Sequence, residues 1–467
     1  MNVPRRPRPW TDRLPVAVVV TFVLLREVLR VAAVPLHAIG YLLRRGHHRA
    51  GALAALRRTP DPSADPIGTF LRRHRHAPPA DAPTREPHLF VSCGEASGER
   101  HADGFLTAAR DAGLRARITG FGGPVVARHG SLAFPLAEHA VIGFGAVVVA
   151  LPRILRAFAT FARLLRTDPP DLIVLVDYPG LHMVMGRYAR RRGIPVVHYV
   201  APQHWAWAPW RMKRYARCVD LTLTLFPFEV PLLQAGGVLA AYVGHPLLEP
   251  RGAQPPPLRD ATIGGPDRPA TLLLMPGSRG GEIATHLPPF LRIARAMRAE
   301  DPSLRIAVAQ TESRHRERIE RILADADAGF ATLQIGPLSN QLDAADVVLV
   351  KSGTGSLEVA LRLVPNVVAY SIQSWLVRWM ARHFLTVPFF AAANLVSGRV
   401  VVPEIGVRVD SEWARVEAAV RRLLRDPESR AALHRELVAV RAALGEPGAD
   451  RRVAAVLLAF CNPTERP

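Results

Sequence analysis

Regular alternation of short apolar runs with longer amphipathic segments predicts an α/β chain of two Rossmann-like domains, whose parallel sheets face a cleft. The chain has 467 residues, which is too long for one ordinary hydrophobic core. The alternation begins near residue 88, breaks in a Pro-, Gly- and Arg-rich stretch at 249–268, and then starts again. The apolar runs are continuous, as in parallel strands that are covered on both faces. We therefore expect an N-terminal extension at 1–86, a first domain at 87–250 and a second at 251–467.

The first domain is predicted to begin with a strand at 88–93, a helix at 99–112 and a strand at 117–120. A basic helix then separates two further strands and supplies the crossover that a parallel pair requires. The remaining strands are expected at 172–176, 196–200, 221–225 and 241–243, and around Leu272, Ile306, Leu333, Val347 and Val367 in the second domain.

The first 86 residues form a hydrophobic and basic extension of this body. Apolar runs lie at 14–25 and 31–43, and the first is shorter than the ~20 residues that a helix needs to cross a bilayer. The arginines that precede them are Arg5, Arg6, Arg8 and Arg13. We expect an interfacial or anchoring helix here, because arginine flanks suit anionic headgroups. A buried extension and a cleaved signal peptide are the alternatives. The stretch 58–87 is predicted to be a Pro/Arg-rich linker.

The charge of the chain points to anionic partners. Its formal net charge is +20 and comes almost entirely from arginine, because Lys213 and Lys351 are the only lysines. Acidic lipid or a phosphorylated substrate fits this charge. The sequence has no zinc-finger spacing, RNP-like motif or basic low-complexity tail, so no nucleic-acid partner is expected. Cys93, Cys218 and Cys461 form no metal-binding or disulfide pattern, which fits a reducing compartment.

Two Gly- and Ser-rich turns, each after an apolar run, mark a candidate nucleotide-sugar site. At the carboxyl ends of strands, such turns offer backbone N–H groups and a helix N-terminus to a diphosphate. Arg279 adds a fixed cation, and Glu358 supplies a carboxylate for ribose hydroxyls. The predicted nucleotide-binding residues are Gly277, Ser278, Arg279, Gly280, Ser352, Gly353, Thr354 and Glu358.

Short segments along the body match one family in their order. They are Gly94–Gly98, Val176–Pro179, Tyr199–Trp207, Leu225–Glu229, Gly244–Leu247, Pro276–Gly280, Ser352–Thr354, Leu357–Glu358 and Asn394–Leu395. Each segment is a weak signal alone, but the ordered set spans about 88–425. On these segments the chain resembles lipid-A-disaccharide synthase, a glycosyltransferase of the two-Rossmann (GT-B) type.

The resemblance implies an inverting sugar transfer from UDP-2,3-diacylglucosamine to 2,3-diacylglucosamine 1-phosphate (lipid X). The products are lipid A disaccharide 1-phosphate and UDP. The resemblance also implies that no metal or other cofactor takes part, so that arginine and backbone amides carry the charge of the diphosphate. The expected partners are the two lipid substrates and the anionic surface of the inner membrane, on its cytoplasmic face. A homodimer is the assembly that we consider.

Two carboxylates are candidates for acid–base chemistry. Asp177 ends an apolar strand, matches a family aspartate, and is the predicted general base for the acceptor 6-hydroxyl. The alternative is a strand-end Asp that caps the next turn. Glu95 is the rival base or a neighbour of the acceptor phosphate, and its alternative is a helix N-terminal carboxylate stabilised by the dipole. Gly94, Ser97 and Gly98 are expected to let substrate approach the backbone closely.

The other predicted substrate contacts are Trp205, Trp207 and Asn394. All three lie in segments that match the family, although a loop-capping role is the alternative for Asn394. His204, beside the two tryptophans, is expected to pack rather than to react.

Two apolar segments are candidates for lipid handling. Residues 140–158 are apolar and then punctuated by arginine, and a helix buried against the sheet is the alternative. Residues 375–384 combine Trp375 and Trp379 with basic side chains that suit a membrane interface. A helix that crosses between the domains is the alternative.

The sequence departs from the family pattern on the acceptor side. Glu99 stands where the family places Asp, Ala208 where it places Arg, and Gly180 where some members carry a second Asp. Two other functions therefore stay open. One is a different UDP-sugar transferase or a 2-epimerase on the same fold, and the other is a lipid-binding paralogue with weak or no catalysis.

Overall fold

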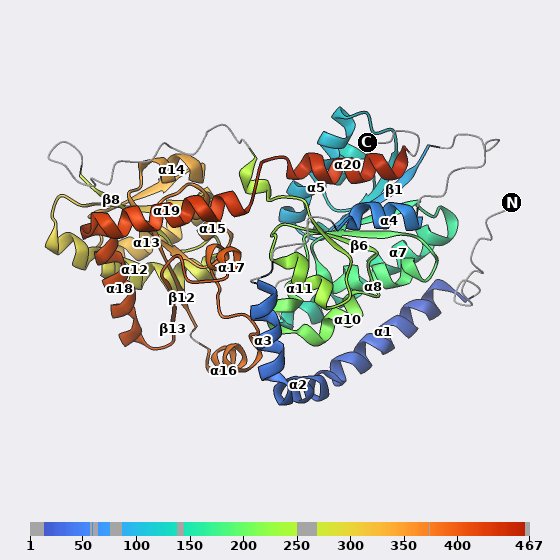
Figure 1. Ribbon diagram of the computed structural model, residues 1–467, viewed down its shortest axis with the longest axis horizontal. Coiled ribbons are helices and arrows are strands. Elements are labelled where there is room, and N and C mark those ends of the chain that lie inside the picture. The colour runs from blue at the N-terminus through green and yellow to red at the C-terminus, as the bar shows by residue number, and fades with distance from the viewer. Residues whose placement is uncertain are drawn as a thin grey trace. The chain divides into compact units, whose positions relative to one another are not determined.

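The chain folds into two compact units that are each built around a parallel sheet (Figure 1). The computed structural model describes residues 14–56, 58, 64–74, 86–137, 144–249, 269–372 and 374–462. Unit 1 comprises Met1–Pro246 with Pro447–Pro467, and unit 2 comprises Leu247–Glu446. The arginines predicted to precede the first apolar run lie outside the described residues, as do 138–143, 250–268 and Gln373.

Unit 1 contains a seven-stranded sheet in the order β3-β2-β1-β4-β5-β6-β7, with every neighbouring pair parallel. The strands are β1 His88–Cys93, β2 Arg117–Phe121, β3 Ser131–Phe134, β4 Leu172–Val176, β5 Val196–Tyr199, β6 Leu221–Thr224 and β7 Ala240–Tyr242. Because successive side chains of a strand point to opposite faces, the apolar strands contribute side chains to two separate cores, one on each face of the sheet. Phe90, Ile173 and Leu175 belong to one core, whereas Val91, Val174 and Val176 belong to the other.

Helices close both faces of this sheet. The first core packs beneath α7 (Phe144–Thr167), α8 (Pro179–Arg190) and α10 (Met212–Tyr215), and the second packs beneath α5 (Ala96–Asp111). Shorter helices are α6 Pro124–His129, α9 His204–Trp207 and α11 Glu229–Ala235. Within the expected lipid segment 140–158, Ala157 and Phe158 are buried in the first core, which favours the packing alternative for that part of α7.

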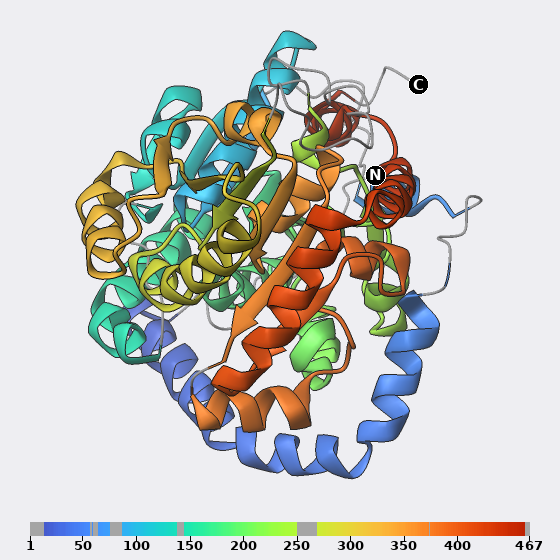
Figure 2. The same cartoon turned by 90° about the vertical axis from the view of Figure 1, so that its left-hand side faces the viewer.

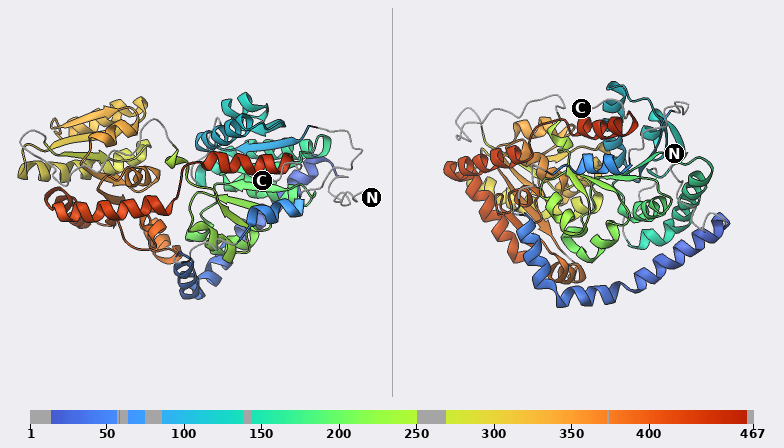
Figure 3. Two further views of the ribbon diagram at one scale, coloured as in Figure 1. Left: turned by 45° about the horizontal axis from the view of Figure 1, so that its top comes forward. Right: turned by 45° about the vertical axis from the view of Figure 1, so that its right-hand side comes forward.

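The last helix returns to unit 1. Helix α20 (Ala449–Cys461) packs on α5 and on α4 (Pro66–His74), as the left view of Figure 3 shows. Val453 and Leu457 are buried in the second core of unit 1. Residues after 446 therefore belong with unit 1, whereas the sequence boundary placed them in the second domain. Apolar periodicity predicts a helix but does not say which core receives it.

The N-terminal extension is helical and packs on unit 1. Helices α1 (Val16–Ala32), α2 (Val34–Leu43) and α3 (Arg45–Leu56) follow one another as a curved strip (Figure 2). Helix α1 packs on α7, and α3 packs on α11. The expected linker contains α4, whose Phe70 is fully buried, so this part is a piece of the core rather than a linker. Across the described parts of the chain, no helix combines the length and apolar character needed to span a bilayer.

Unit 2 contains a six-stranded parallel sheet in the order β10-β9-β8-β11-β12-β13. The strands are β8 Thr271–Met275, β9 Arg305–Gln310, β10 Ala331–Ile335, β11 Val347–Lys351, β12 Asn366–Ser371 and β13 Glu404–Val407. The helices are α12 Gly280–Glu300, α13 Arg316–Asp325, α14 Leu338–Ala344, α15 Thr354–Leu361, α16 Trp375–Phe384, α17 Ala392–Ser397, α18 Trp413–Arg425 and α19 Pro427–Ala443.

The predicted α/β class and the two parallel-sheet domains are confirmed. Every strand expected from an apolar run is present, whereas the edge strands β3 and β13 are not signalled by such a run. Helix α5 starts at Ala96 rather than at Glu99. Helix α15 starts at Thr354, so Glu358 lies in its second turn.

Glu99 ties α5 to α6. Its side chain is buried, and Oε1 accepts hydrogen bonds from the N–H groups of Gly123 at 2.6 Å and Val126 at 3.4 Å. These N–H groups lie at the start of α6, where a helix has no internal acceptor for them. The departure from Asp at this position therefore serves a structural contact inside unit 1.

We expect the Glu99→Ala variant to lower the free energy of unfolding of unit 1 by about 1–3 kcal/mol, because two buried N–H groups lose their acceptor. Urea unfolding followed by circular dichroism measures this loss. Glu320→Ala is the control, since it removes an exposed ion pair with Arg316 and should change nothing measurable. Equal stability of the Glu99→Ala protein and the wild type would show that the contact is dispensable.

Candidate active site

In unit 1 the two candidate carboxylates follow neighbouring strands at the place where the strand order reverses. Strand β1 lies between β2 and β4, and Cys93 pairs with Val176 at the end of the β1–β4 ladder. Glu95 follows β1, and Asp177 comes directly after β4. Open α/β sheets bind ligands outside the carboxyl ends of strands at such a reversal. The sheet thus brings Glu95 and Asp177 to one edge.

The chain at this edge takes backbone conformations that non-glycine residues rarely adopt. Asp177 and Tyr178 both have a φ of 52°, and Val200, after β5, has a φ of 69°. Aspartate tolerates this left-handed region, but for other residues it costs about 1–2 kcal/mol each. Such strain persists only where the surrounding structure enforces it, and it concentrates at functional sites. The edge formed by β1, β4 and β5 is therefore the candidate site of unit 1.

Asp177 has the environment that a general base needs. Its side chain is half-buried. Burial raises the pKa of the carboxyl above its usual 3.8, and a hydrogen bond from the Tyr178 N–H offsets this only partly. A raised pKa brings the carboxylate closer to the range in which it can take a proton from a hydroxyl. Its backbone carbonyl accepts hydrogen bonds from His182 and His198, which no sequence motif singles out.

Gly94 lies directly beneath an aromatic ring. A Cβ atom on Gly94 would lie 2.0 Å from Cγ of Tyr178, so only glycine fits beneath that ring. Glu95 precedes α5, but its side chain makes no capping hydrogen bond there. Burial and the charge of Glu95 both raise the pKa of Tyr178, which places this carboxylate near the ring. Ser97 and Gly98 lie in the first turn of α5.

Trp205 and Trp207 differ in exposure. Trp205 is buried with its ring edge-on to Phe228, whereas Trp207 is 42% exposed. The Arg211 guanidinium lies over the Trp207 ring, 5.1 Å from its centroid. Ala208, at the family's arginine position, is fully buried, so Arg211 is the cation beside this tryptophan.

His204 packs in the interior, as expected. Its Nε2 lies 3.3 Å from Sδ of Met183, and burial lowers its pKa to about 3. Gly180, the other departure, lies in the first turn of α8, where an added Cβ atom would meet nothing within 4 Å. The site therefore has room for a side chain at position 180.

In unit 2 the predicted nucleotide turns also flank a strand-order reversal. Strand β8 lies between β9 and β11, and Met275 pairs with Val350. Gly277, Ser278 and Arg279 lead from β8 into α12, which begins at Gly280. Ser352 and Gly353 lead from β11 into α15, which begins at Thr354. The N-termini of α12 and α15 thus follow two neighbouring strands. Backbone N–H groups at such helix N-termini bind anions.

A carboxylate of the protein lies against the first of these turns. Glu282 Oε1 is 3.0 Å from the Lys351 Nζ and 3.3 Å from Nη1 of Arg279, and Oε2 accepts the Ser278 N–H at 3.2 Å. Gly277, at a φ of 122°, leaves room for it, since an added Cβ atom would lie 2.6 Å from Oε2. Burial raises the pKa of Glu282, but Lys351 and the other donors outweigh burial and lower it, so Glu282 is ionised.

Lys351 is a cation of this site that directly precedes the second predicted turn but is not among the predicted nucleotide-binding residues. It ends β11, it is largely buried, and its ammonium lies 5.4 Å from the centroid of the Tyr370 ring. Arg279, the cation expected from sequence, is 61% exposed. The signal for Lys351 was its residue type, because it is one of only two lysines in an arginine-rich chain.

Asn394 is a structural residue in this conformation. It is fully buried, and its amide donates to the carbonyl of Val402 and to Glu404 while its oxygen accepts the N–H groups of Val401 and Val402. These four bonds use the full capacity of an asparagine side chain. The loop-capping alternative therefore accounts for Asn394, and its predicted contact with substrate is not supported. Glu358 is half-buried on α15.

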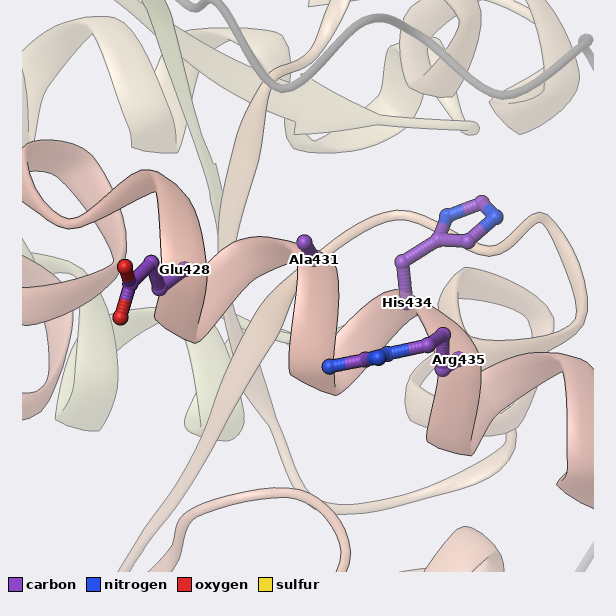
Figure 4. A pocket seen from close by; sticks show the side chains of 4 residues that line it. All are labelled: Glu428, Ala431, His434 and Arg435. Carbon is purple, nitrogen blue, oxygen red and sulfur yellow. The ribbon is translucent and has the colours of Figure 1, made fainter.

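A hollow lies along helix α19 of unit 2 (Figure 4). It has a volume of about 410 Å³ and is lined by Glu428, Ala431, His434 and Arg435. All four residues come from one helix, α19, and none follows a strand. None of the predicted site residues lines this hollow.

Comparisons with known proteins show which family the chain resembles along most of its length. The family model described as lipid-A-disaccharide synthetase matches residues 89–448. The lipid-A-disaccharide synthase of Anaeromyxobacter dehalogenans is 36% identical over 380 residues, which cover 81% of this chain and 98% of that protein. The enzyme of the same name from Geobacter sulfurreducens is 33% identical over 375 residues, which cover 79% of this chain and 96% of that protein.

Solved structures share the fold at low sequence identity. MurG of Acinetobacter baumannii has a TM-score of 0.50 at 16% identity, covering 80% of this chain and 100% of that one. The UDP-GlcNAc 2-epimerase of Neisseria meningitidis bound to UDP-GlcNAc has a TM-score of 0.52 at 11% identity. The match covers 80% of this chain and 100% of that one. These likenesses concern the fold alone. The family match over most of the chain decides the identity: the chain belongs to the lipid-A-disaccharide synthase family of glycosyltransferases.

Proposed function

We propose that the chain transfers 2,3-diacylglucosamine from its UDP derivative to the 6-hydroxyl of 2,3-diacylglucosamine 1-phosphate (lipid X). The products are lipid A disaccharide 1-phosphate and UDP. One observation carries the proposal. In a chain that matches the family over residues 89–448, the candidate base and the candidate phosphate turns each follow strands at a strand-order reversal.

Asp177 is the proposed general base. As the acceptor oxygen attacks the anomeric carbon, Asp177 takes the hydroxyl proton, the new C–O bond forms, and the bond to UDP breaks on the opposite side. The anomeric configuration inverts, and the pair of electrons leaves with the β-phosphate. Glu95 is proposed to lie beside the acceptor, with Ser97 and Gly98 at the α5 N-terminus. The exposed face of Trp207, with Arg211, supplies an aromatic and cationic surface for the acylated, anionic acceptor.

The donor is proposed to bind at the two turns of unit 2. N–H groups of Gly277, Ser278 and Gly280 and of Ser352, Gly353 and Thr354 would receive the diphosphate. The Arg279 and Lys351 cations would balance the charge that develops on the leaving group. Glu358, one turn further along α15, is proposed to accept hydrogen bonds from the ribose hydroxyls.

A membrane surface is the proposed partner of the extension. Val19 and Val23 of α1 face the core, whereas large apolar side chains of α1 and α2 are 45–83% exposed. These exposed side chains are Val18, Phe22, Leu25, Val28, Leu29, Val31, Leu36, Ile39 and Leu43. Glu27 is the one carboxylate in residues 14–56 and is paired with Arg214 at 2.7 Å, which leaves this strip with a basic excess. Such a strip fits the interface of an anionic bilayer.

The α16 helix is a second candidate for the same surface. Trp375 is 70% exposed and Trp379 is also exposed, as an interfacial helix requires. The proposed location is the cytoplasmic face of the inner membrane, where the protein would be peripheral or anchored by its N-terminal segment. Light scattering of the purified protein tests whether it forms the homodimer that we consider.

Incubation with UDP-2,3-diacylglucosamine and lipid X tests the reaction. We expect disaccharide 1-phosphate and UDP in equal amounts, scored by mass spectrometry and nucleotide chromatography. Folded protein that binds lipid but forms no product would favour the lipid-binding alternative. Conversion of a UDP-sugar without acceptor would favour an epimerase.

The Asp177→Asn variant should lose about 10²–10⁴-fold in kcat, because an amide of nearly the same shape cannot take the proton. Its UDP affinity, measured by calorimetry, should stay at the wild-type value, since the proposed donor residues lie in unit 2. In the wild type, kcat should fall as the pH drops through the raised pKa of Asp177, because the protonated acid is no base. Wild-type turnover by Asp177→Asn would remove Asp177 from the mechanism.

The Lys351→Met variant should weaken UDP binding by about 10-fold, as expected when one charge-assisted hydrogen bond worth roughly 1.5 kcal/mol is lost. Calorimetric titration with UDP measures the change. Lys213→Met is the matched control, because Lys213 is the only other lysine and is exposed on α10 of unit 1. Equal weakening in both variants would mean that overall charge, rather than this site, governs binding.

Combined Phe22→Glu, Leu25→Glu and Leu29→Glu substitutions should reduce sedimentation with phosphatidylglycerol-containing vesicles at least 10-fold, because each buried apolar side chain contributes more than about 1 kcal/mol. Point changes are preferable to deletion of the extension, since Phe70 is part of the core. Val438→Glu is the control, an equally exposed apolar site on α19. Unchanged sedimentation of the triple variant would exclude the α1 strip as the docking surface.

A further inference from the structure

The turn after β4 needs an external constraint. Asp177 and Tyr178 are consecutive non-glycine residues in the left-handed region. Aspartate tolerates this region, but for Tyr178 it is costly, because the left-handed conformation pushes the Cβ atom toward a carbonyl oxygen. The constraint therefore has to come from side chains packed against the turn.

Two buried histidines supply it by donating to a single carbonyl. The Nδ1 of His182 lies 2.6 Å from the carbonyl oxygen of Asp177, and Nε2 of His198 lies 2.9 Å from the same atom. The two rings come from different elements, α8 and β5, and each is only 1% exposed. A carbonyl with both lone pairs engaged in this way is fixed in direction.

Neighbouring hydroxyls set which nitrogen of each ring carries the proton. A carbonyl only accepts, so the nitrogen that faces it must be the N–H, and the other nitrogen of a neutral ring must accept. Ser92 Oγ lies 2.8 Å from Nε2 of His182, and the Tyr215 hydroxyl lies 2.7 Å from Nδ1 of His198. Both hydroxyls therefore donate to the rings. Thr222 in turn donates to Tyr215 at 2.9 Å.

Burial keeps both rings neutral. It lowers the pKa of His182 to about 3 and that of His198 to about 4. The order of donors and acceptors therefore does not change across the pH range in which an enzyme is assayed. The other titratable groups near the turn are Glu95 and Arg153, which act on Tyr178.

We propose that His182 and His198 are positioning residues for Asp177: by fixing its carbonyl they hold the left-handed turn in which its carboxylate stays half-buried. This inference rests on the proposed role of Asp177 as the base. Neither histidine touches the reacting atoms. Each acts through the backbone of the residue that does.

The ring geometry allows a test by matched substitution. An asparagine amide can replace an Nδ1–H, and a glutamine amide can replace an Nε2–H. His182→Asn and His198→Gln should therefore keep kcat within about 3-fold of wild type. His182→Leu and His198→Asn should lose about 10–100-fold in kcat with little change in KM, as expected for a base displaced by about 1 Å. UDP affinity should be unchanged in all four.

The pH profile separates positioning from general destabilisation. With the turn released, water reaches Asp177, its pKa falls toward the ordinary value, and the acid limb of kcat should move to lower pH in His182→Leu. His129→Leu is the control, because it removes another buried histidine of unit 1, bonded to Asp103 at 2.8 Å, and should leave the limb in place.

Three outcomes would overturn the inference. The first is a wild-type kcat in His182→Leu. The second is an acid limb of the kcat–pH profile that stays in place in His182→Leu. The third is an equal kcat in His198→Gln and His198→Asn. If His182→Leu does not fold, the comparison of kcat in His198→Gln and His198→Asn still tests the positioning role. The Asp177→Asn variant keeps the two proposals apart. If it turns over normally, the base assignment fails, whereas an inactive Asp177→Asn beside normal histidine variants refutes only the positioning role.

Discussion

Each sheet of this protein starts in its middle, and the candidate sites follow from that constraint. Strands β1 and β8 are the first of their sheets, and later strands are added on both sides of them. Crossovers between parallel strands are right-handed, so the helices that leave toward the two sides must cover opposite faces. Beside β1 and beside β8 the chain therefore opens a crevice at the carboxyl ends. The residues that follow β1, β4, β8 and β11 line these crevices. The strand order alone places them there, whatever their side chains are.

Much of this arrangement could be predicted because parallel strands buried on both faces leave continuous apolar runs. The same signal fails at the sheet edges, where β3 and β13 are short and partly exposed. It also cannot assign α20 to unit 1, since amphipathic spacing shows that a helix is buried but not against what. Gly- and Ser-rich turns after apolar runs predicted the phosphate site, and a strand-end position together with the family match predicted Asp177.

The residues to which we assign a role only from the structure make contacts that exist only in the folded chain. Lys351 reaches Glu282 across sixty-nine positions of sequence, and His182 and His198 converge on one carbonyl from two elements. Asn394 shows the reverse error, because a motif residue turned out to be consumed by its own loop. Motifs report which residues matter to a family. They do not report whether a residue touches substrate or holds the backbone.

Glu282 gives the proposed nucleotide site a resident counter-ion. Its carboxylate pairs with Lys351 and Arg279 and accepts the Ser278 N–H. A diphosphate that binds there would exchange with an anion rather than fill a bare cationic site, so only the difference between two sets of charge-assisted bonds would appear as affinity. Such an exchange moderates binding and eases departure of the product, because the carboxylate is tethered beside the donors that the leaving diphosphate vacates.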